Sequence, residues 1–405
     1  MEFKNKQLPN GLNIIGEVNK SAKSAAVGFF VKTGSRDETM DINGVSHFLE
    51  HMLFKGTDKL SAFEVNEAFD KTGAQFNAFT SEELTVFYAA VLPEYLAEVT
   101  NLWSQLMRPI LRDDDFNMEK NVIKEEIAMY QDLPNFEVMD KCRSLHFEGH
   151  PCGQSVLGTI ESIDGLSSTQ MRNYFVNRYS PNNMTLTVVG NFDWAKISDM
   201  AEKLCSRWQK QLVSRETTHY AGSAKKDRIE KPNLVSEHIC MMSAGVSAQD
   251  TRRFAAHILA TVIGDAYGSR YFWDLVDSAI AQSAAMQFGG MDGTGAFYSY
   301  FQCRKEKSNE VIDIANSILA DISENGITQE ELTKAKNKIL SAIVLKNELP
   351  MGRLVDLGFN WVYNNKYITT EEEIESVKTV TNNDIKLLIA DIQPLTYTQF
   401  SLGPA

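Results

Sequence analysis

The sequence lacks long hydrophobic runs, an excess of positive charge and a dense set of cysteines. No stretch of about 18 apolar residues occurs, so no segment is expected to span a membrane. The formal net charge is −13, which argues against nucleic acid as a partner because nucleic-acid-binding surfaces are basic. The five cysteines are scattered and form no CxxC pair. They indicate free thiols in a reducing compartment rather than a disulfide framework.

The length and the element pattern indicate two domains. A chain of 405 residues is too long for one ordinary core, and its 43% hydrophobic and 23% charged residues are typical of a globular protein. Strand-like and helix-like stretches alternate along the first half. A polar segment without apolar periodicity follows at 213–232 and is interpreted as a linker. We therefore predict an N-terminal domain at 1–212 and a C-terminal domain at 233–405.

The second half of the chain repeats features of the first. When residues 113–140 are moved forward by 216 positions, Leu133 and Pro134 fall on Leu349 and Pro350. Two amphipathic helices share apolar spacing by chance, but the shared Leu-Pro stop favours an internal duplication. The repeat does not extend to two glutamates of this segment, because the residues aligned with them in the second half are Ala335 and Ala342. If both halves share one fold, the fold alone does not need those carboxylates.

The segment GVSHFLEHMLFKGT at 44–57 predicts an amphipathic helix with an unusual polar face. His47 and His51 are one turn apart and point to the same side, and Glu50 lies beside them. The residues suited to bounding this helix are Asn43 or Ser46 at its start and Gly56 at its end. A polar trio packed against apolar side chains costs free energy unless something satisfies it. A metal ion would do so.

A second predicted helix, at 113–131, carries carboxylates on an apolar stripe. Glu119, Val122, Ile123 and Glu126 follow one another at helical spacing. Two glutamates on a stripe that faces the core need partners, and the two histidines are the obvious ones. Two histidines, one carboxylate and a water make the ligand set of a catalytic zinc site. The glutamate of the first helix, next to a ligand but outside the ligand set, is placed to take a proton from the water.

HxxEH is the inverted zincin motif, and the sequence resembles the pitrilysin or insulinase family of zinc metallopeptidases. It looks most like the short-chain branch that includes bacterial relatives of the mitochondrial processing peptidase. The segments that carry the resemblance lie in order along the first half at 44–57, 73–93, 119–134 and 149–159. The resemblance implies an α+β fold of two homologous domains, each a mostly antiparallel sheet with helices packed on it. It also implies dimers that enclose a chamber.

The resemblance assigns roles residue by residue. His47, His51 and Glu126 match the ligands of one Zn²⁺ per chain, Glu50 matches the catalytic base, and Glu119 matches an acid that orients a ligand. Glu125 is the competing third ligand, on a helix face rotated by about 100°. The substrate edge strand of the family is matched by Asn77, Ala78, Phe79 and Thr80. A peptide can add to such an edge as an extra strand.

The match weakens in the second half. Active members carry an arginine and a tyrosine that contact the substrate carbonyl region, and here these positions fall on Val276 or a neighbour and near Gln282. Arg270 and Tyr271 are expected to serve packing. The expected partner is therefore a second copy or a related subunit that carries the Arg/Tyr pair. Other stand-ins, Tyr298 and Tyr300, and a slow enzyme are the alternatives.

The predicted function is zinc-dependent endopeptidase activity on oligopeptides or on unstructured, basic, presequence-like segments. The alternative is a non-catalytic scaffold subunit of the same fold. The N-terminal stretch resembles neither a signal peptide nor a transit peptide. We expect a cytoplasmic bacterial protein, and a mitochondrial matrix or a trimmed periplasmic form stays open. The remaining histidines have no partner at ligand spacing and are expected to be structural: His146, His150, His219, His238 and His257.

Overall fold

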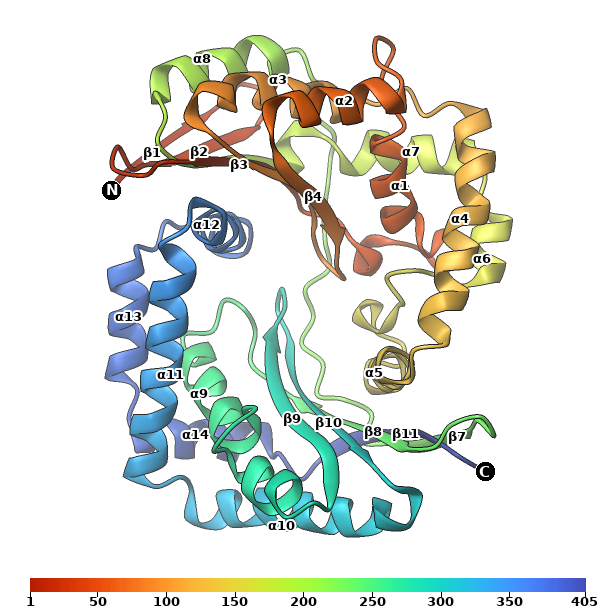
Figure 1. Ribbon diagram of the computed structural model, residues 1–405, viewed down its shortest axis with the longest axis vertical. Coiled ribbons are helices and arrows are strands. Elements are labelled where there is room, and N and C mark those ends of the chain that lie inside the picture. Colours follow the sequence, from red (N-terminus) through yellow and green to blue (C-terminus); the bar gives the residue numbers. More distant parts are fainter. The chain divides into compact units, whose positions relative to one another are not determined.

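A computed structural model describes residues 1–405 (Figure 1). The chain forms two compact units. Unit 1 comprises Met1–Ala128, Gln154–Arg215 and Leu345–Ile368, and unit 2 comprises Met129–Gly153, Glu216–Val344 and Thr369–Ala405. None of the helices has the length and the apolarity that a membrane span requires.

Unit 1 contains a six-stranded sheet with the order β1-β2-β6-β3-β5-β4. All neighbours pair antiparallel except β2 and β6. The strands are β1 Glu2–Gln7, β2 Asn13–Val18, β3 Ala25–Val31, β4 Gln75–Thr80, β5 Thr85–Val91 and β6 Met184–Gly190. The helices are α1 Val45–Leu53, α2 Ala62–Thr72, α3 Leu96–Leu106, α4 Asp113–Gln131, α6 Ile160–Gly165, α7 Ser168–Arg178, α8 Trp194–Cys205 and α12 Pro350–Asn364.

Unit 2 contains a five-stranded sheet with the order β7-β11-β8-β10-β9, in which only β7 and β11 pair in parallel. The strands are β7 Lys226–Glu230, β8 Glu237–Ala244, β9 Ala281–Gly290, β10 Gly295–Cys303 and β11 Tyr397–Gly403. The helices are α5 Pro134–His146, α9 Arg253–Gly264, α10 Ser308–Asn325, α11 Gln329–Asn347, α13 Thr370–Thr379 and α14 Asn382–Ile392.

The two sheets correspond strand by strand, as an internal duplication would require. Adding five to each strand number from β2 to β6 converts the order β2-β6-β3-β5-β4 into β7-β11-β8-β10-β9, and the parallel pair falls at the same place. The helices α4 and α11 have 19 residues each. Both sheets are mostly antiparallel and carry helices, as the predicted α+β class requires.

Strand β3, an inner strand of the unit 1 sheet, is buried on both faces. Every residue of β3 is buried, so this strand is a continuous apolar run rather than an alternating one. Phe30 packs in a cluster with Leu354 and Leu357 of α12, whereas the neighbouring Phe29 ring lies 6.0 Å from that of Trp208. This alternation places α12 on one face of the sheet and Trp208, which follows α8, on the other.

The compact units depart from the predicted boundaries in two segments. Helix α12 comes from the second half of the chain and packs on β3 and β6 of unit 1, and α5 comes from the first half and packs on β8 and β11 of unit 2 (Figure 1). In α12, buried Arg353 donates to the Glu17 carboxylate of β2 at 2.7 Å. The segment interpreted as a linker, 213–232, is not unstructured throughout, because it contains β7, which pairs with β11.

All five cysteines are buried free thiols, as predicted from their scattered positions.

Candidate metal centre

The first helix of the site, α1, is held in place by its apolar side. Its apolar side chains are buried to within 1% exposure: Val45, Phe48, Leu49, Met52 and Leu53. His47 and His51 share the other side, with ring centroids 4.8 Å apart. The predicted bounds of this helix were wrong. Gly44 is the N-cap residue and no side chain of the first turn caps the helix, which ends at Leu53 before Gly56.

The second helix, α4, brings its carboxylates to α1. Glu119 and Ile123 are buried, and the Glu126 side chain is 22% exposed. The stripe was predicted one residue too wide, because Val122 is 46% exposed. Val122 lies at the edge of the stripe, rotated by about 100° from Ile123, and that rotation is enough to turn it to solvent. The exposed Glu125 lies outside the site.

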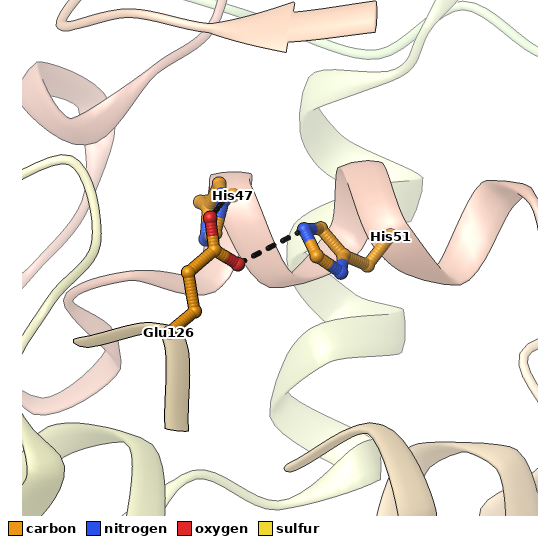
Figure 2. A group of neighbouring side chains, drawn as sticks. All are labelled: His47, His51 and Glu126. Carbon is orange, nitrogen blue, oxygen red and sulfur yellow. Dashed lines mark ion pairs between the residues drawn. The ribbon is translucent and has the colours of Figure 1, made fainter. Parts of the chain in front are cut away.

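His47, His51 and Glu126 converge, and their donor atoms all lie within 4.8 Å of one another. Figure 2 shows the Glu126 carboxylate facing both imidazole rings. One carboxylate oxygen is 3.6 Å from His47 Nε2, and the other is 3.4 Å from His51 Nε2. These three residues come from positions 47, 51 and 126 of the sequence, so the fold joins two distant segments.

The donor set fits a zinc ion. Zn–N and Zn–O distances of about 2.1 Å at a tetrahedral angle separate two ligand atoms by about 3.4 Å. The separations of 3.6 Å from His47 Nε2 and 3.4 Å from His51 Nε2 are close to this value, each to a different oxygen of Glu126. They are longer than an ordinary hydrogen bond, for which about 2.7–3.2 Å is usual. Two imidazoles and one carboxylate also leave a fourth position for water or substrate.

Glu119 fixes the orientation of His51. Its Oε1 lies 2.9 Å from His51 Nδ1, and its Oε2 lies 2.5 Å from the ammonium group of Lys55. A proton on Nδ1 leaves Nε2 with a lone pair toward Glu126, which is the tautomer that a metal ligand needs. Sequence reasoning missed Lys55, although it lies one turn after His51 in the same segment.

Glu50 lies beside the donor set and is held by the edge strand β4. Thr80 donates a hydrogen bond from Oγ1 to Glu50 Oε2 at 2.5 Å. Strand β4 pairs only with β5 and leaves its other edge without a strand. Along it, Asn77 is exposed, Ala78 is buried, and Phe79 and Thr80 are half-buried. The hydroxyl of Thr80 therefore faces the predicted base, a contact that the sequence did not reveal.

Burial and charge shift the titration of the two histidines and the three glutamates of the site. Burial, reinforced by the neighbouring His51, lowers the pKa of His47 to about 3. Burial also lowers the pKa of His51, but three nearby carboxylates outweigh it and raise this pKa above the ordinary value. Burial raises the pKa of Glu50 and of Glu126. Burial raises the pKa of Glu119 as well, but contacts with His51 and Lys55 reverse this effect and lower it overall.

Neither the other histidines nor the segment expected to hold the Arg/Tyr pair joins the donor set of His47, His51 and Glu126. His146 Nδ1 is 3.2 Å from the Thr398 hydroxyl, and His238 Nδ1 is 2.8 Å from the Tyr300 hydroxyl. Arg270 pairs with Glu331 at 2.7 Å. The predicted packing role of Tyr271 agrees with its 0% exposure. Val276 and Gln282 lie in the π-helical turn Phe272–Asp277 and in strand β9.

Comparison with known proteins shows what this chain resembles. An uncharacterized zinc protease of Bacillus subtilis is 30% identical over 98% of this chain and 97% of its own length. An uncharacterized zinc protease of Streptomyces coelicolor is 29% identical over 98% of this chain and 88% of its own. The chain is thus a homologue of bacterial zinc proteases.

The family follows from two matching models. One, described as "Insulinase (Peptidase family M16)", matches residues 13–160, and the other, described as "Peptidase M16 inactive domain", matches residues 165–339. The chain belongs to the M16, or insulinase, family of peptidases. This confirms the resemblance stated from the sequence.

Solved structures show the same fold at low sequence identity. A protease from Helicobacter pylori superposes with a TM-score of 0.93 at 20% identity, with all of both chains covered. A chain of complex III2 from Candida albicans superposes with a TM-score of 0.85 at 18% identity, covering 99% of this chain and 95% of its own. The fold therefore occurs both in a protease and in a chain of complex III2.

Proposed function

We propose that this chain is a zinc-dependent endopeptidase with one Zn²⁺ site formed by His47, His51 and Glu126. The observation that carries the proposal is the convergence of these donor atoms within 4.8 Å, with Glu50 beside them. When bound, zinc supplies a Lewis acid that lowers the pKa of water and polarises a carbonyl group.

The protein's own residues supply the proton transfers and the orientation. Glu50 takes a proton from the attacking water at its carboxylate and passes it to the leaving amine. Its raised pKa, caused by burial, brings it closer to neutral pH, which suits a group that must both accept and release a proton. Glu119 holds His51 in the required tautomer through the 2.9 Å contact at Nδ1.

The substrate that suits this site is an extended peptide. A peptide that adds to the open edge of β4 would form backbone hydrogen bonds next to Glu50 and place one of its amides at the donor set. Oligopeptides and unstructured segments can adopt this conformation. The net charge of −13 favours basic, presequence-like segments among them.

The Arg/Tyr pair that is absent at Val276 and Gln282 motivates a subunit partner. We propose that a homodimer, or a heterodimer with a related subunit that carries the pair, encloses the site in a chamber. This arrangement predicts weak hydrolysis by the isolated chain. Strong peptidase activity of the chain purified alone would remove the reason for a second kind of subunit.

A non-catalytic scaffold role is the second candidate. The structural match to a chain of complex III2 favours it, and the complete donor set with a base beside it argues against it. The two candidates differ in bound metal, because a scaffold would purify without zinc.

The proposal is tested by zinc content and peptide hydrolysis of the wild-type chain and of Glu50→Gln, alone and mixed with a related subunit. We expect one zinc per chain in both proteins and hydrolysis only in the wild type. Absence of zinc from both proteins would support the scaffold role, and full turnover by Glu50→Gln would show that another residue is the base.

A further inference from the structure

The metal helix α1 begins without a cap of its own. The first N–H groups of a helix have no partner within the helix and normally receive one from a Ser, Thr, Asp or Asn at the N-cap. Here the N-cap residue is Gly44, with φ +92°, and no side-chain cap bond is made there. The start of α1 is buried, with Asn43 at 4% and Ser46 at 0% exposure, so bulk water does not reach these donors.

A buried carboxylate from an earlier turn takes the place of the cap. Glu38 accepts hydrogen bonds from the backbone N–H of Ser46 at its Oε1 and of Gly44 at its Oε2, both at 2.7 Å. The side-chain amide of Asn43 donates to the same Oε2 at 2.9 Å. Glu38 is only 5% exposed. Both of its oxygens therefore serve as acceptors for the first turn of α1.

The geometry explains why the group is a carboxylate. Each oxygen faces a backbone N–H, so an amide in its place would set an N–H₂ donor against another donor. Burial raises the pKa of Glu38 to about 7, and the donated hydrogen bonds oppose this rise. A negative group at a helix N-terminus also interacts favourably with the helix dipole. Burying a charge here costs free energy that a neutral Ser or Thr cap would not.

Other contacts fix the same turn from other sides. The Ser46 hydroxyl lies 2.7 Å from the Tyr174 hydroxyl, which lies 2.7 Å from the Thr33 hydroxyl. A Cβ at Gly44 would meet the carbonyl oxygen of Leu157 at 2.6 Å. The first turn thus has little room to move, and His47 follows directly after Ser46.

We propose that Glu38 is a positioning residue of the metal site: its carboxylate fixes the first turn of α1 and so sets where His47 and His51 meet Glu126. This inference rests on the proposed zinc site and goes beyond it, because Glu38 touches neither the metal ligands nor the base. It assigns a role to a buried charge that the proposed reaction does not use.

The test compares Glu38→Gln with Glu38→Asp and with a matched control, Glu17→Gln. Glu17 is equally buried in unit 1 and holds the ion pair with Arg353, so its variant also loses a buried charge, but away from α1. Zn²⁺ affinity is measured by competition with a chromophoric chelator, the Co²⁺ absorption spectrum reports ligand geometry, and deuterium uptake of residues 44–53 is followed in the metal-free full chain.

We expect Glu38→Gln to bind Zn²⁺ about 10-fold to 100-fold more weakly than the wild type. We also expect an altered Co²⁺ spectrum and faster uptake over residues 44–53. Glu38→Asp keeps the charge but withdraws the oxygens by one methylene, so weaker binding by this variant as well would show that position and not charge alone matters. Glu17→Gln should keep the wild-type affinity and spectrum.

Wild-type affinity in Glu38→Gln, or an equal loss in Glu17→Gln, would overturn the inference. If Glu38→Gln does not fold, wild-type affinity and uptake in Glu38→Asp would overturn it. If the wild type binds no Zn²⁺, the proposed function fails instead, and unchanged deuterium uptake over residues 44–53 in metal-free Glu38→Gln would separately refute the anchoring by Glu38.

Discussion

Two adjacent glutamates of α4 have opposite surroundings. Glu126 faces the imidazoles at 3.4 and 3.6 Å, whereas Glu125 is exposed. We predict that Glu126→Gln lowers zinc occupancy by at least about tenfold at limiting zinc, because a neutral amide is a weaker ligand. Glu125→Gln, which makes the same chemical change one residue away, should keep full occupancy. Metal analysis after dialysis measures both, and loss of zinc from Glu125→Gln instead would reverse the assignment.

Thr80 has a second role besides its place in the edge strand. Its hydroxyl donates to Glu50 at 2.5 Å, which orients the base and opposes the rise that burial causes in the pKa of Glu50. Thr80→Val should therefore lower kcat about 10-fold to 100-fold, with unchanged zinc content. The acid limb of the pH–rate profile should move to higher pH. Thr80→Ser keeps the hydroxyl and is the control; a Thr80→Val enzyme with wild-type kcat would leave the contact without a catalytic role.

The proton on His51 competes with zinc. Nearby carboxylates raise the pKa of His51 above the ordinary 6.5, so this residue takes up a proton as the pH falls through that raised pKa. Zinc needs the neutral ring, and the apparent dissociation constant should rise by about tenfold per pH unit below that pKa. In Glu119→Gln the pKa of His51 is lower, and the rise should begin at lower pH. Chelator competition at several pH values measures this, and coincident onsets would contradict it.

At the scale of elements, the features that the sequence predicted correctly are those determined by helical spacing and by residues that stop a helix. The spacing of His47 and His51 and the Leu133–Pro134 stop after α4 are local features, and the structure has both. Strand β1 and the cap from Glu38 were missed. The first is a polar edge strand with no buried residue, and the second is a contact between an isolated glutamate and a helix eight residues later. Neither feature produces an apolar periodicity by which it could be predicted from the sequence.

The sequence also did not predict that α5, from the first half of the chain, packs in unit 2 and that α12, from the second half, packs in unit 1. Both helices follow a Leu-Pro stop, and both have apolar faces that fit an equivalent sheet. Periodicity shows that a face is buried but not which sheet buries it. In the structure the choice for α12 is marked by a specific polar contact, the buried pair of Arg353 with Glu17, which is joined by the Tyr367 hydroxyl at 2.8 Å.

The buried ion pair of Arg353 with Glu17 allows a test of how much the contact between α12 and the sheet of unit 1 contributes to stability. Arg353→Met should destabilise the fold by about 3–5 kcal/mol, because Glu17 is then left buried without its cation. Chemical denaturation measures the loss. The double variant Glu17→Gln/Arg353→Met removes both charges and should recover part of the stability. Equal stability of the single and double variants would show that the cost comes from lost packing of the arginine stem rather than from an unpaired charge.

At the scale of the whole molecule, one fold occurs twice and carries one site. The strand orders of the two sheets correspond, but in the second copy Ala335 and Ala342 of α11 occupy the positions of Glu119 and Glu126. A sheet of this topology is therefore stable without the carboxylates. This is consistent with a family model described as an inactive domain matching residues 165–339. In unit 1 the carboxylates carry a desolvation cost, which a bound cation would offset.

Zinc should therefore stabilise unit 1 and leave unit 2 unchanged. A ligand at about 100 times its dissociation constant adds about 2.7 kcal/mol, which for a unit of this size raises the unfolding midpoint by roughly 5–10 °C. We predict that a chelator lowers the unfolding midpoint of residues 1–128 by this amount and leaves the midpoint of residues 233–344 unchanged. Deuterium uptake at rising temperature measures both midpoints. Glu126→Gln should show no response to the chelator. An equal response of both segments would mean either that the two units unfold together or that unit 2 has a metal site of its own. The number of zinc ions per wild-type chain, measured by metal analysis, distinguishes these two cases.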